Sequence, residues 1–197
     1  MAHPDRLDGS SDPSPADWIG QPAEVVYARL LERDELGIEA TCRSVLRDRA
    51  LLLELSVVYA EALREVAFEC EIASLEDATD GWIEHSVVRA TDRLLDRQRS
   101  EEDAGLPFDP EDYRILRGIF GLAPAEGRRA SVHFHALPTR LRRVFQVLIL
   151  DDRPLADATE LGLGKTPELL QAILTAFEAV GATISPERMP LGLRGEG

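Results

Sequence analysis

The stretch PTRLRRVFQVLILDDRPLADATELGLGKTPELLQAILTAFEAV, residues 138–180, decides the fold. Apolar residues recur in it every three or four positions, which predicts three consecutive helices, in 138–150, 154–163 and 167–180. Pro154 and Pro167 favour helix starts, where a missing amide donor costs no hydrogen bond. Ala158 precedes Gly162 by four residues, a spacing that lets two helices cross closely beside a tight turn. The segment therefore predicts a helix-turn-helix, although helical hairpins of other kinds have the same pattern.

The N-terminal half of the sequence is predicted to be helical as well. Helical periodicity is found in residues 22–48, with a break at Gly37, and in residues 49–73 and 81–99. The apolar face of 49–73 is broad enough to contact several neighbours, as the central helix of a bundle does. Asp77 or Asp80 is expected to cap the helix that follows.

The predicted architecture is all-α, with two small helical domains joined by a linker. A flexible leader, residues 1–21, is rich in Pro, Ser, Asp and Gly and precedes an N-terminal helical domain, residues 22–99. Acidic residues, glycine and proline in residues 100–127 indicate a solvated linker with a short helix. A C-terminal helix-turn-helix domain is expected over 128–182 and a poorly ordered tail over 183–197.

Composition excludes several classes of protein. The 197 residues include 22 Lys and Arg against 36 Asp and Glu, for a net charge of -14. Such a surface repels nucleic acid at long range, so binding driven by bulk positive charge is excluded. No apolar run approaches the roughly 20 residues that cross a bilayer. Cys42 and Cys70 lie on apolar helix faces and are predicted core residues. We expect a cytoplasmic protein with no membrane partner.

The residues that carry enzyme chemistry do not form a convincing set. His133 and His135 are two positions apart, with no cysteine or carboxylate at ligand spacing, and are expected as surface imidazoles on a semi-extended loop. The string GLGK, residues 162–165, lacks the earlier glycine of a phosphate-binding loop and follows a helix. We therefore predict no enzyme, no metal site and no cofactor.

A basic cluster stands out in this acidic chain. Residues 128–143 contain five arginines and no acidic residue, namely Arg128, Arg129, Arg140, Arg142 and Arg143. Such a local positive face could contact phosphates once a partner has delivered the protein to DNA. The alternative is a helix face whose arginines pair with acids of the N-terminal domain, and the sequence leaves both open.

Four segments together resemble the extracytoplasmic-function class of bacterial RNA polymerase sigma factors. ARLLERDELGIEATCRSV, residues 28–45, is similar to the opening helix and turn of that family. ALREVAFECEI, residues 62–72, resembles its polymerase-docking helix, and GWIEHSVVRATDRLLDRQR, residues 81–99, its −10 promoter helix. LPTRLRRVFQVLILDDRPLADATELGLG, residues 137–164, is the strongest match, to the start of the promoter-reading domain.

This resemblance implies partners and roles for individual residues. The implied partners are core RNA polymerase, promoter DNA and, for a regulated factor, an anti-sigma factor. The −10 DNA contacts are expected from Trp82, Arg89, Arg93, Arg97 and Arg99, and the −35 contacts from Arg140, Arg142, Arg143, Lys165, Thr166 and Gln171. Contacts to protein partners are expected from Leu63, Val66 and Phe68 and from Leu170, Ile173 and Phe177.

The predicted recognition helix departs from the family pattern. Alignment of Leu169 and Ile173 inward leaves Leu170, Gln171 and Ala172 facing outward, where a DNA reader needs polar groups. Two functions therefore stay open: a divergent sigma factor, or a sigma-like protein-interaction module that has lost DNA binding. A helical protein of unrelated ancestry is a third reading.

Overall fold

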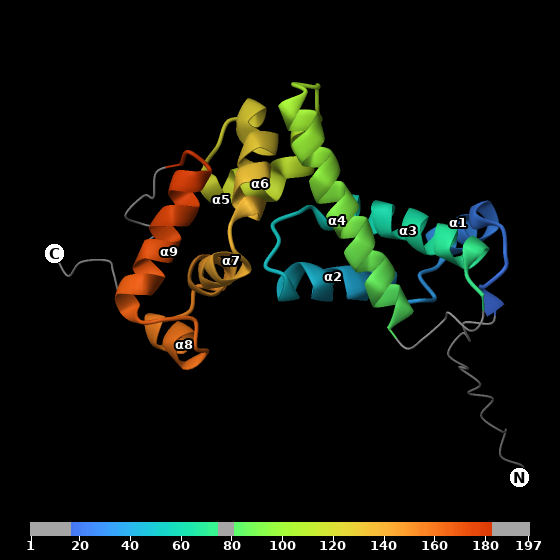
Figure 1. Ribbon diagram of the computed structural model, residues 1–197, viewed down its shortest axis with the longest axis horizontal. Coiled ribbons are helices and arrows are strands. Elements are labelled where there is room, and N and C mark those ends of the chain that lie inside the picture. Colours follow the sequence, from blue (N-terminus) through green and yellow to red (C-terminus); the bar gives the residue numbers. More distant parts are fainter. Residues whose placement is uncertain (1–16, 75–80, 183–197) are drawn as a thin grey trace, which may run out of the picture.

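The computed structural model describes residues 17–74 and 81–182, where all regular structure is helical, as predicted (Figure 1). The N-terminal bundle consists of α1 (Ala23–Glu32), α2 (Ile38–Asp48), α3 (Leu55–Ile72) and α4 (Trp82–Asp103). The C-terminal bundle consists of η2 (Pro110–Tyr113), α5 (Arg114–Phe120), η3 (Pro124–Glu126), α6 (Gly127–Ala136), α7 (Thr139–Phe145), η4 (Gln146–Leu150), α8 (Leu155–Glu160) and α9 (Thr166–Ala179).

The N-terminal bundle is built around α3, which packs against α1, α2 and α4. Its core includes Trp18, Leu30, Ile38 and Leu63. Cys42 and Cys70 are fully buried in that core, as the sequence predicts. Burial raises the pKa of Cys42 to about 12 and that of Cys70 to about 11, so both thiols stay protonated.

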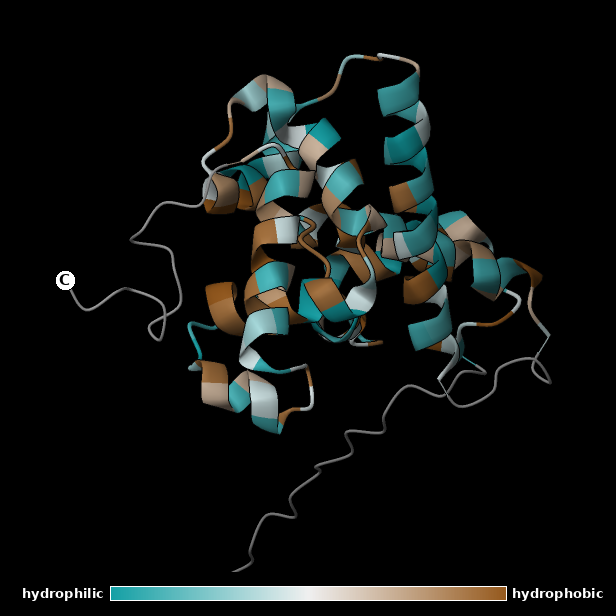
Figure 2. Cartoon of the chain, turned by 60° about the vertical axis from the view of Figure 1, so that its left-hand side comes forward, coloured by the Kyte–Doolittle hydropathy of each residue, from teal (hydrophilic) through white to brown (hydrophobic). Residues whose placement is uncertain are grey.

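The C-terminal bundle has an aromatic core. Four phenylalanines from four helices meet there, namely Phe120, Phe134, Phe145 and Phe177. The rings of Phe120 and Phe145 stack with centroids 5.0 Å apart, and Phe177 meets Phe120 edge-on at 5.0 Å. Such geometries add attraction to the burial of the rings. Figure 2 shows apolar and polar residues alternating along the helices, as expected of helices that bury one side.

The region between the two bundles differs from the solvated linker that the sequence predicts. Helix α4 continues to Asp103, and the short helix around residues 111–120 places Leu116 and Phe120 in the C-terminal core. Arg128 of α6 is only 2% exposed and donates to Glu102 Oε2 at 2.9 Å and to the Leu106 carbonyl at 2.5 Å. A buried cation needs such partners, and they hold the acidic run against α6.

The segment predicted as a loop with surface imidazoles is helix α6, and this expectation is corrected. His133 is exposed, but His135 lies against the N-terminal bundle, where its Nε2 accepts the Leu52 amide at 3.0 Å. No described helix is long and apolar enough to span a membrane. The caps proposed at Asp77 and Asp80, the tail, and most of the leader lie outside the described residues.

Candidate functional site

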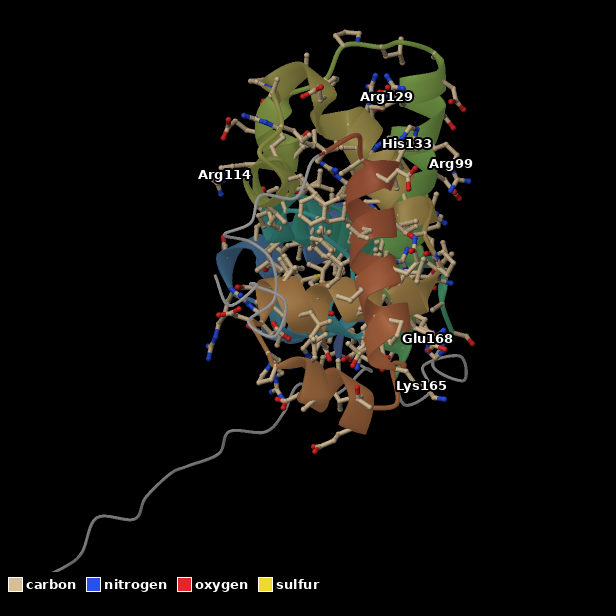
Figure 3. All side chains as sticks on the ribbon, turned by 90° about the vertical axis from the view of Figure 1, so that its left-hand side faces the viewer. Arg99, Arg114, Arg129, His133, Lys165 and Glu168 are labelled. Atoms are coloured by element: carbon tan, nitrogen blue, oxygen red, sulfur yellow. The ribbon has the colours of Figure 1, made fainter. Side chains whose placement is uncertain are left out.

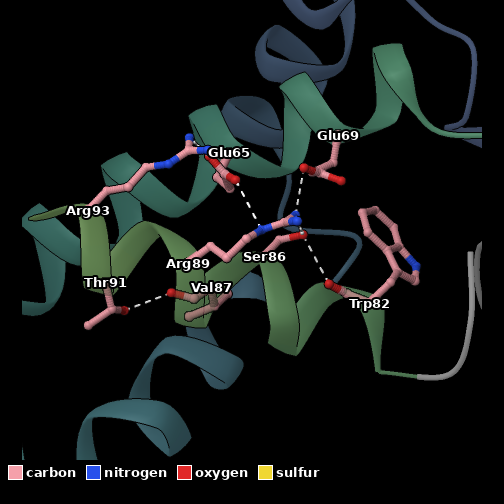
Figure 4. A network of polar contacts seen from close by, with 8 residues as sticks. All are labelled: Glu65, Glu69, Trp82, Ser86, Val87, Arg89, Thr91 and Arg93. Atoms are coloured by element: carbon pink, nitrogen blue, oxygen red, sulfur yellow. Dashed lines mark hydrogen bonds and ion pairs between the residues drawn. The ribbon is translucent and has the colours of Figure 1, made fainter. Parts of the chain in front are cut away.

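The predicted −10 contact helix, α4, presents its arginines to α3 (Figure 4). Arg89 lies 3.3 Å from Glu65 and 2.6 Å from Glu69, and Arg93 pairs with Glu65. Arg97 continues the series by pairing with Glu61. Both helices repeat their charges every four residues, so the two rows of side chains face each other as a ladder. We call this set the α3–α4 ladder.

The α3–α4 ladder is anchored on Glu65, which is only 4% exposed. The side chains of Arg89, Arg93 and Arg97 keep 47%, 66% and 49% of their surface exposed. Their charge is therefore balanced by carboxylates, while one side of each guanidinium still reaches solvent. DNA contact by these three arginines would compete with existing ion pairs.

Two other α4 residues of the predicted DNA site are placed differently. Trp82 begins α4 and packs partly buried against the N-terminal core, and its carbonyl accepts the Ser86 hydroxyl at 3.0 Å. Arg99 is exposed and forms no ion pair within the described ranges 17–74 and 81–182. Figure 3 places Arg99 in the upper part of the view and Lys165 in the lower part, so they form no common basic patch.

Helices α8 and α9 occupy the segment that the sequence predicts as a helix-turn-helix. Ala158 of α8 is fully buried under α9, and Gly162 in the turn has a φ of 71°, which favours glycine. The predicted turn at Gly162 is thus confirmed, and the small side chain of Ala158 is packed inside the C-terminal core.

Arg140 of α7 binds the turn between α8 and α9. Its Nε donates to the Leu163 carbonyl at 2.9 Å, and its Nη2 donates to Glu168 at 3.0 Å. The Lys165 amide and Arg140 both donate to Glu168, and these bonds hold the pKa of that carboxyl below its usual range. Arg140, predicted to contact DNA, is engaged inside the C-terminal bundle, with its side chain 57% exposed.

The outward face of α9 only partly matches the prediction. Lys165, Thr166 and Gln171 are exposed, and Leu170 is half-buried. Ala172 is 3% exposed, so the expectation that it faces outward is corrected; the outward apolar residue is Leu174. The buried stripe follows positions 169, 172, 173, 176 and 177, because α9 packs against both α7 and α6.

Four residues assigned to protein partners belong to the cores. Leu63 and Val66 are buried in the N-terminal core, and Ile173 and Phe177 in the C-terminal core. Their side chains are closed to a partner in this conformation, because they fill the contacts between helices. Phe68 is 48% exposed and lies one turn before Ile72, which is 59% exposed. Phe68 and Ile72 form an apolar patch on α3.

Arg142 and Arg143 bind main-chain carbonyls of the N-terminal bundle. Arg143 donates to the Asp48 carbonyl at 2.9 Å, and Arg142 donates to the Arg49 carbonyl at 3.2 Å. Arg142 also donates to the His135 carbonyl at 2.6 Å and is only 7% exposed. Of the two alternatives for the basic cluster, internal pairing describes these two arginines, although their acceptors are carbonyls and not acids.

His135 also takes part in the contact between the two bundles, a role that the sequence did not predict. Its Nε2 accepts the Leu52 amide, so its Nδ1 carries the proton and donates to Ser131 Oγ at 3.2 Å. The Ser131 hydroxyl in turn donates to Gln98 of α4 at 3.0 Å. The residue as a whole is only partly exposed; burial, and then the charge of Arg142, lower its pKa to about 3. The neutral ring therefore links the two bundles.

The described residues offer no metal site. No group of three or more potential metal ligands occurs in the parts of the chain that the structure describes. Compared with family models, curated proteins and solved structures, the chain matches none of them.

Proposed function

We propose that this chain is a sigma-like protein that acts in bacterial transcription initiation by docking on core RNA polymerase in the cytoplasm. The observation that carries the proposal is the helix pair α8–α9. The two helices are in contact, Ala158 of α8 is fully buried, and α9 presents Lys165, Thr166 and Gln171 to solvent. These three side chains offer the donors and acceptors that base or phosphate contacts need.

The N-terminal bundle supports the polymerase-docking part of the proposal. The Phe68–Ile72 patch is an exposed apolar surface on the helix that resembles the family's docking helix. Two large apolar side chains one turn apart form the kind of anchor that helix-mediated protein contacts use. Trp82 and Arg99, both accessible on α4, are the residues suited to stacking on or clamping a melted strand.

The alternative function is a sigma-like interaction module that has lost DNA binding. It is favoured by the arginines, because six of those predicted to bind DNA have internal acceptors: Arg89, Arg93, Arg97, Arg140, Arg142 and Arg143. Leu174 and Glu178 on the outward face of α9 favour it further. In that case the Phe68–Ile72 patch would bind polymerase or an anti-sigma factor without promoter recognition.

Reconstitution with bacterial core polymerase separates these readings. The sigma reading predicts a stable complex in size-exclusion chromatography and run-off transcription from a promoter library. A complex that never initiates would favour the interaction module, and the absence of any complex would contradict the sigma reading and leave only a module that binds a partner other than polymerase. Phe68→Asp should abolish the complex, whereas Leu161→Asp, at a residue 59% exposed on the other bundle, should leave it intact.

A second pair of variants tests promoter reading within the complex. Lys165→Ala combined with Gln171→Ala should weaken promoter binding and reduce its salt dependence, because Lys165 releases a counterion on phosphate contact. Leu174→Ala, on the same helix and 47% exposed, is the matched control. Unchanged promoter affinity in the double variant would exclude α9 as the DNA reader.

A further inference from the structure

A cavity of about 380 Å3 lies between the two bundles. One wall is formed by α2 and the connection that leads to α3, and the opposite wall by α5, α6, α7 and η4. Figure 1 shows α2 and α7 facing each other across this region. The volume falls within the range of roughly 300–1,000 Å3 that is typical of small-molecule sites.

The lining of this cavity is mainly apolar. Leucines of the N-terminal bundle face Phe134, Phe145 and Leu150 of the C-terminal bundle. Leu150 is 37% exposed and Ile115, also in the lining, is 41% exposed, although both are large apolar residues. An apolar guest would remove this surface from water, which is the main source of affinity in such pockets.

The polar groups of the cavity wall have unmet hydrogen-bonding capacity. Arg142 lines the cavity, is more than nine-tenths buried, and its Nε has no hydrogen-bond partner among the described residues. Oε1 of Gln146, one turn further along, is likewise buried and unpartnered, but it is an acceptor, so the open donor that an anion could use is Arg142 Nε. Buried polar atoms without partners are uncommon in native proteins and indicate a missing water, ion or ligand.

The charges around the cavity select the sign of that ligand. Arg43 and Arg47 line it together with Arg142, and the lining contains no carboxylate. Arg43 and Arg47 have acidic neighbours on their own helix, Glu39 at 2.6 Å and Asp48 at 3.5 Å, but Arg142 has no ion pair within the described part of the chain. Burial and the charge of Arg49 lower the pKa of Arg142, so this guanidinium is under-compensated.

We propose that this cavity binds a small amphipathic anion, an aliphatic carboxylate whose chain lies between the bundles and whose charge meets Arg142 and the cavity-lining Arg47. The carboxylate accepts from the arginines, and the aliphatic chain covers the leucines and Phe134 and Phe145. Because the ligand contacts both bundles, its binding couples to their association. This proposal does not depend on the sigma-like function.

Calorimetric titration of the full chain with decanoate and with decan-1-ol tests the proposal. Decanoate should bind at one molecule per chain, roughly tenfold more tightly than the alcohol, because a charge-assisted hydrogen bond is worth more than a neutral one. The absence of saturable decanoate binding would overturn the proposal. Equal affinity for the alcohol would overturn the role of the arginines.

Two matched pairs of variants locate the binding. Leu150→Trp fills the cavity mouth and should abolish binding, whereas Leu161→Trp, at a leucine 59% exposed outside the lining, should not. Arg47→Gln should weaken decanoate several-fold without affecting the alcohol, and Arg64→Gln should change neither. The side chains of Arg47 and Arg64 are similarly exposed, at 70% and 61%. Undiminished decanoate binding by a folded Leu150→Trp variant would place the site elsewhere and contradict the proposal.

Discussion

The arginines of α4 and those of α7 bind different kinds of acceptor. On α4, Arg89, Arg93 and Arg97 pair with carboxylates of the neighbouring helix in their own bundle. On α7, Arg142 and Arg143 donate to main-chain carbonyls of the other bundle, and neither forms an ion pair within the described residues. The first set neutralises a surface, and the second joins two bundles.

The difference shows which positive charges of this acidic chain are not balanced by a carboxylate. The α3–α4 ladder joins half-exposed arginines, whose ion pairs are individually weak, to Glu65, which is only 4% exposed. Arg142 is buried without a counter-ion, and a buried charge is tolerated only where hydrogen bonds and nearby anions compensate it. The contact between the bundles therefore depends on a buried cation that no carboxylate balances within the described residues.

Removal of Arg142 should have the largest effect. In Arg142→Met, the Arg49 and His135 carbonyls lose a charged donor, and we expect the free energy of unfolding to fall by about 3 kcal/mol. Urea denaturation measures this change. Arg143→Met, which loses one hydrogen bond at a more exposed position, should cost about 1 kcal/mol. Equal losses in the two variants would contradict the distinction drawn between them.

The second prediction concerns pH. The pKa of His135 is lowered from 6.5 in the unfolded chain to about 3 in the folded protein, so the folded state excludes a proton that the unfolded state binds. The stability that His135 contributes is complete above pH 6.5 and is lost as pH falls toward 3. One such group should reduce the free energy of unfolding by on the order of 2 kcal/mol between pH 7 and pH 5.

His135→Gln isolates this contribution from the carboxylates. The amide can accept from Leu52 and donate to Ser131, but it does not titrate. Urea denaturation at pH 7, 6 and 5 should therefore give a flatter pH profile for His135→Gln than for the unaltered chain. Parallel profiles would show that His135 becomes protonated in the folded state and is not the buried neutral ring described above.

A smaller effect is expected from Glu65→Gln in the α3–α4 ladder. Two arginines lose their shared carboxylate, but both are half-exposed and can be rehydrated, so we expect a loss of about 1 kcal/mol in urea denaturation. The same change frees Arg93, while Arg89 keeps its ion pair with Glu69, and it should increase affinity for single-stranded DNA at low salt. Glu71→Gln, at an exposed glutamate outside the ladder, is the control. Unchanged DNA affinity would count against a phosphate role for these arginines.

The sequence predicted the features that depend on local periodicity. The central position of α3, the burial of Cys42 and the turn at Gly162 all follow from the spacing of apolar and small residues. The α3–α4 ladder also had a local signal, because acids and arginines repeat at intervals of four on consecutive helices. Those arginines are expected to contact DNA only because the resemblance to sigma factors implies it.

The contact between the bundles could not be predicted in this way. His135, Arg142 and the Leu52 amide are brought together by tertiary packing, and no short-range pattern marks a histidine as an acceptor for an amide 83 positions away. The assignment of Ala172 to the surface failed for a related reason. Periodicity places residues on a helix face but does not say how many helices cover that face.

The smallest expected effect is that of Arg140→Ala at the turn of the helix-turn-helix. Arg140 binds the Leu163 carbonyl and Glu168, and all these groups are accessible to water, so the change in unfolding free energy should stay within about 0.5 kcal/mol. The titration of Glu168 should respond more clearly, because one of the two donors that lower its pKa is gone. A carbon-detected NMR titration of the Glu168 carboxyl should therefore show its pKa rising toward the usual value in Arg140→Ala. The Lys165 amide remains as a donor, so the return should be partial, and an unchanged pKa would show that Arg140 does not hold this turn in solution.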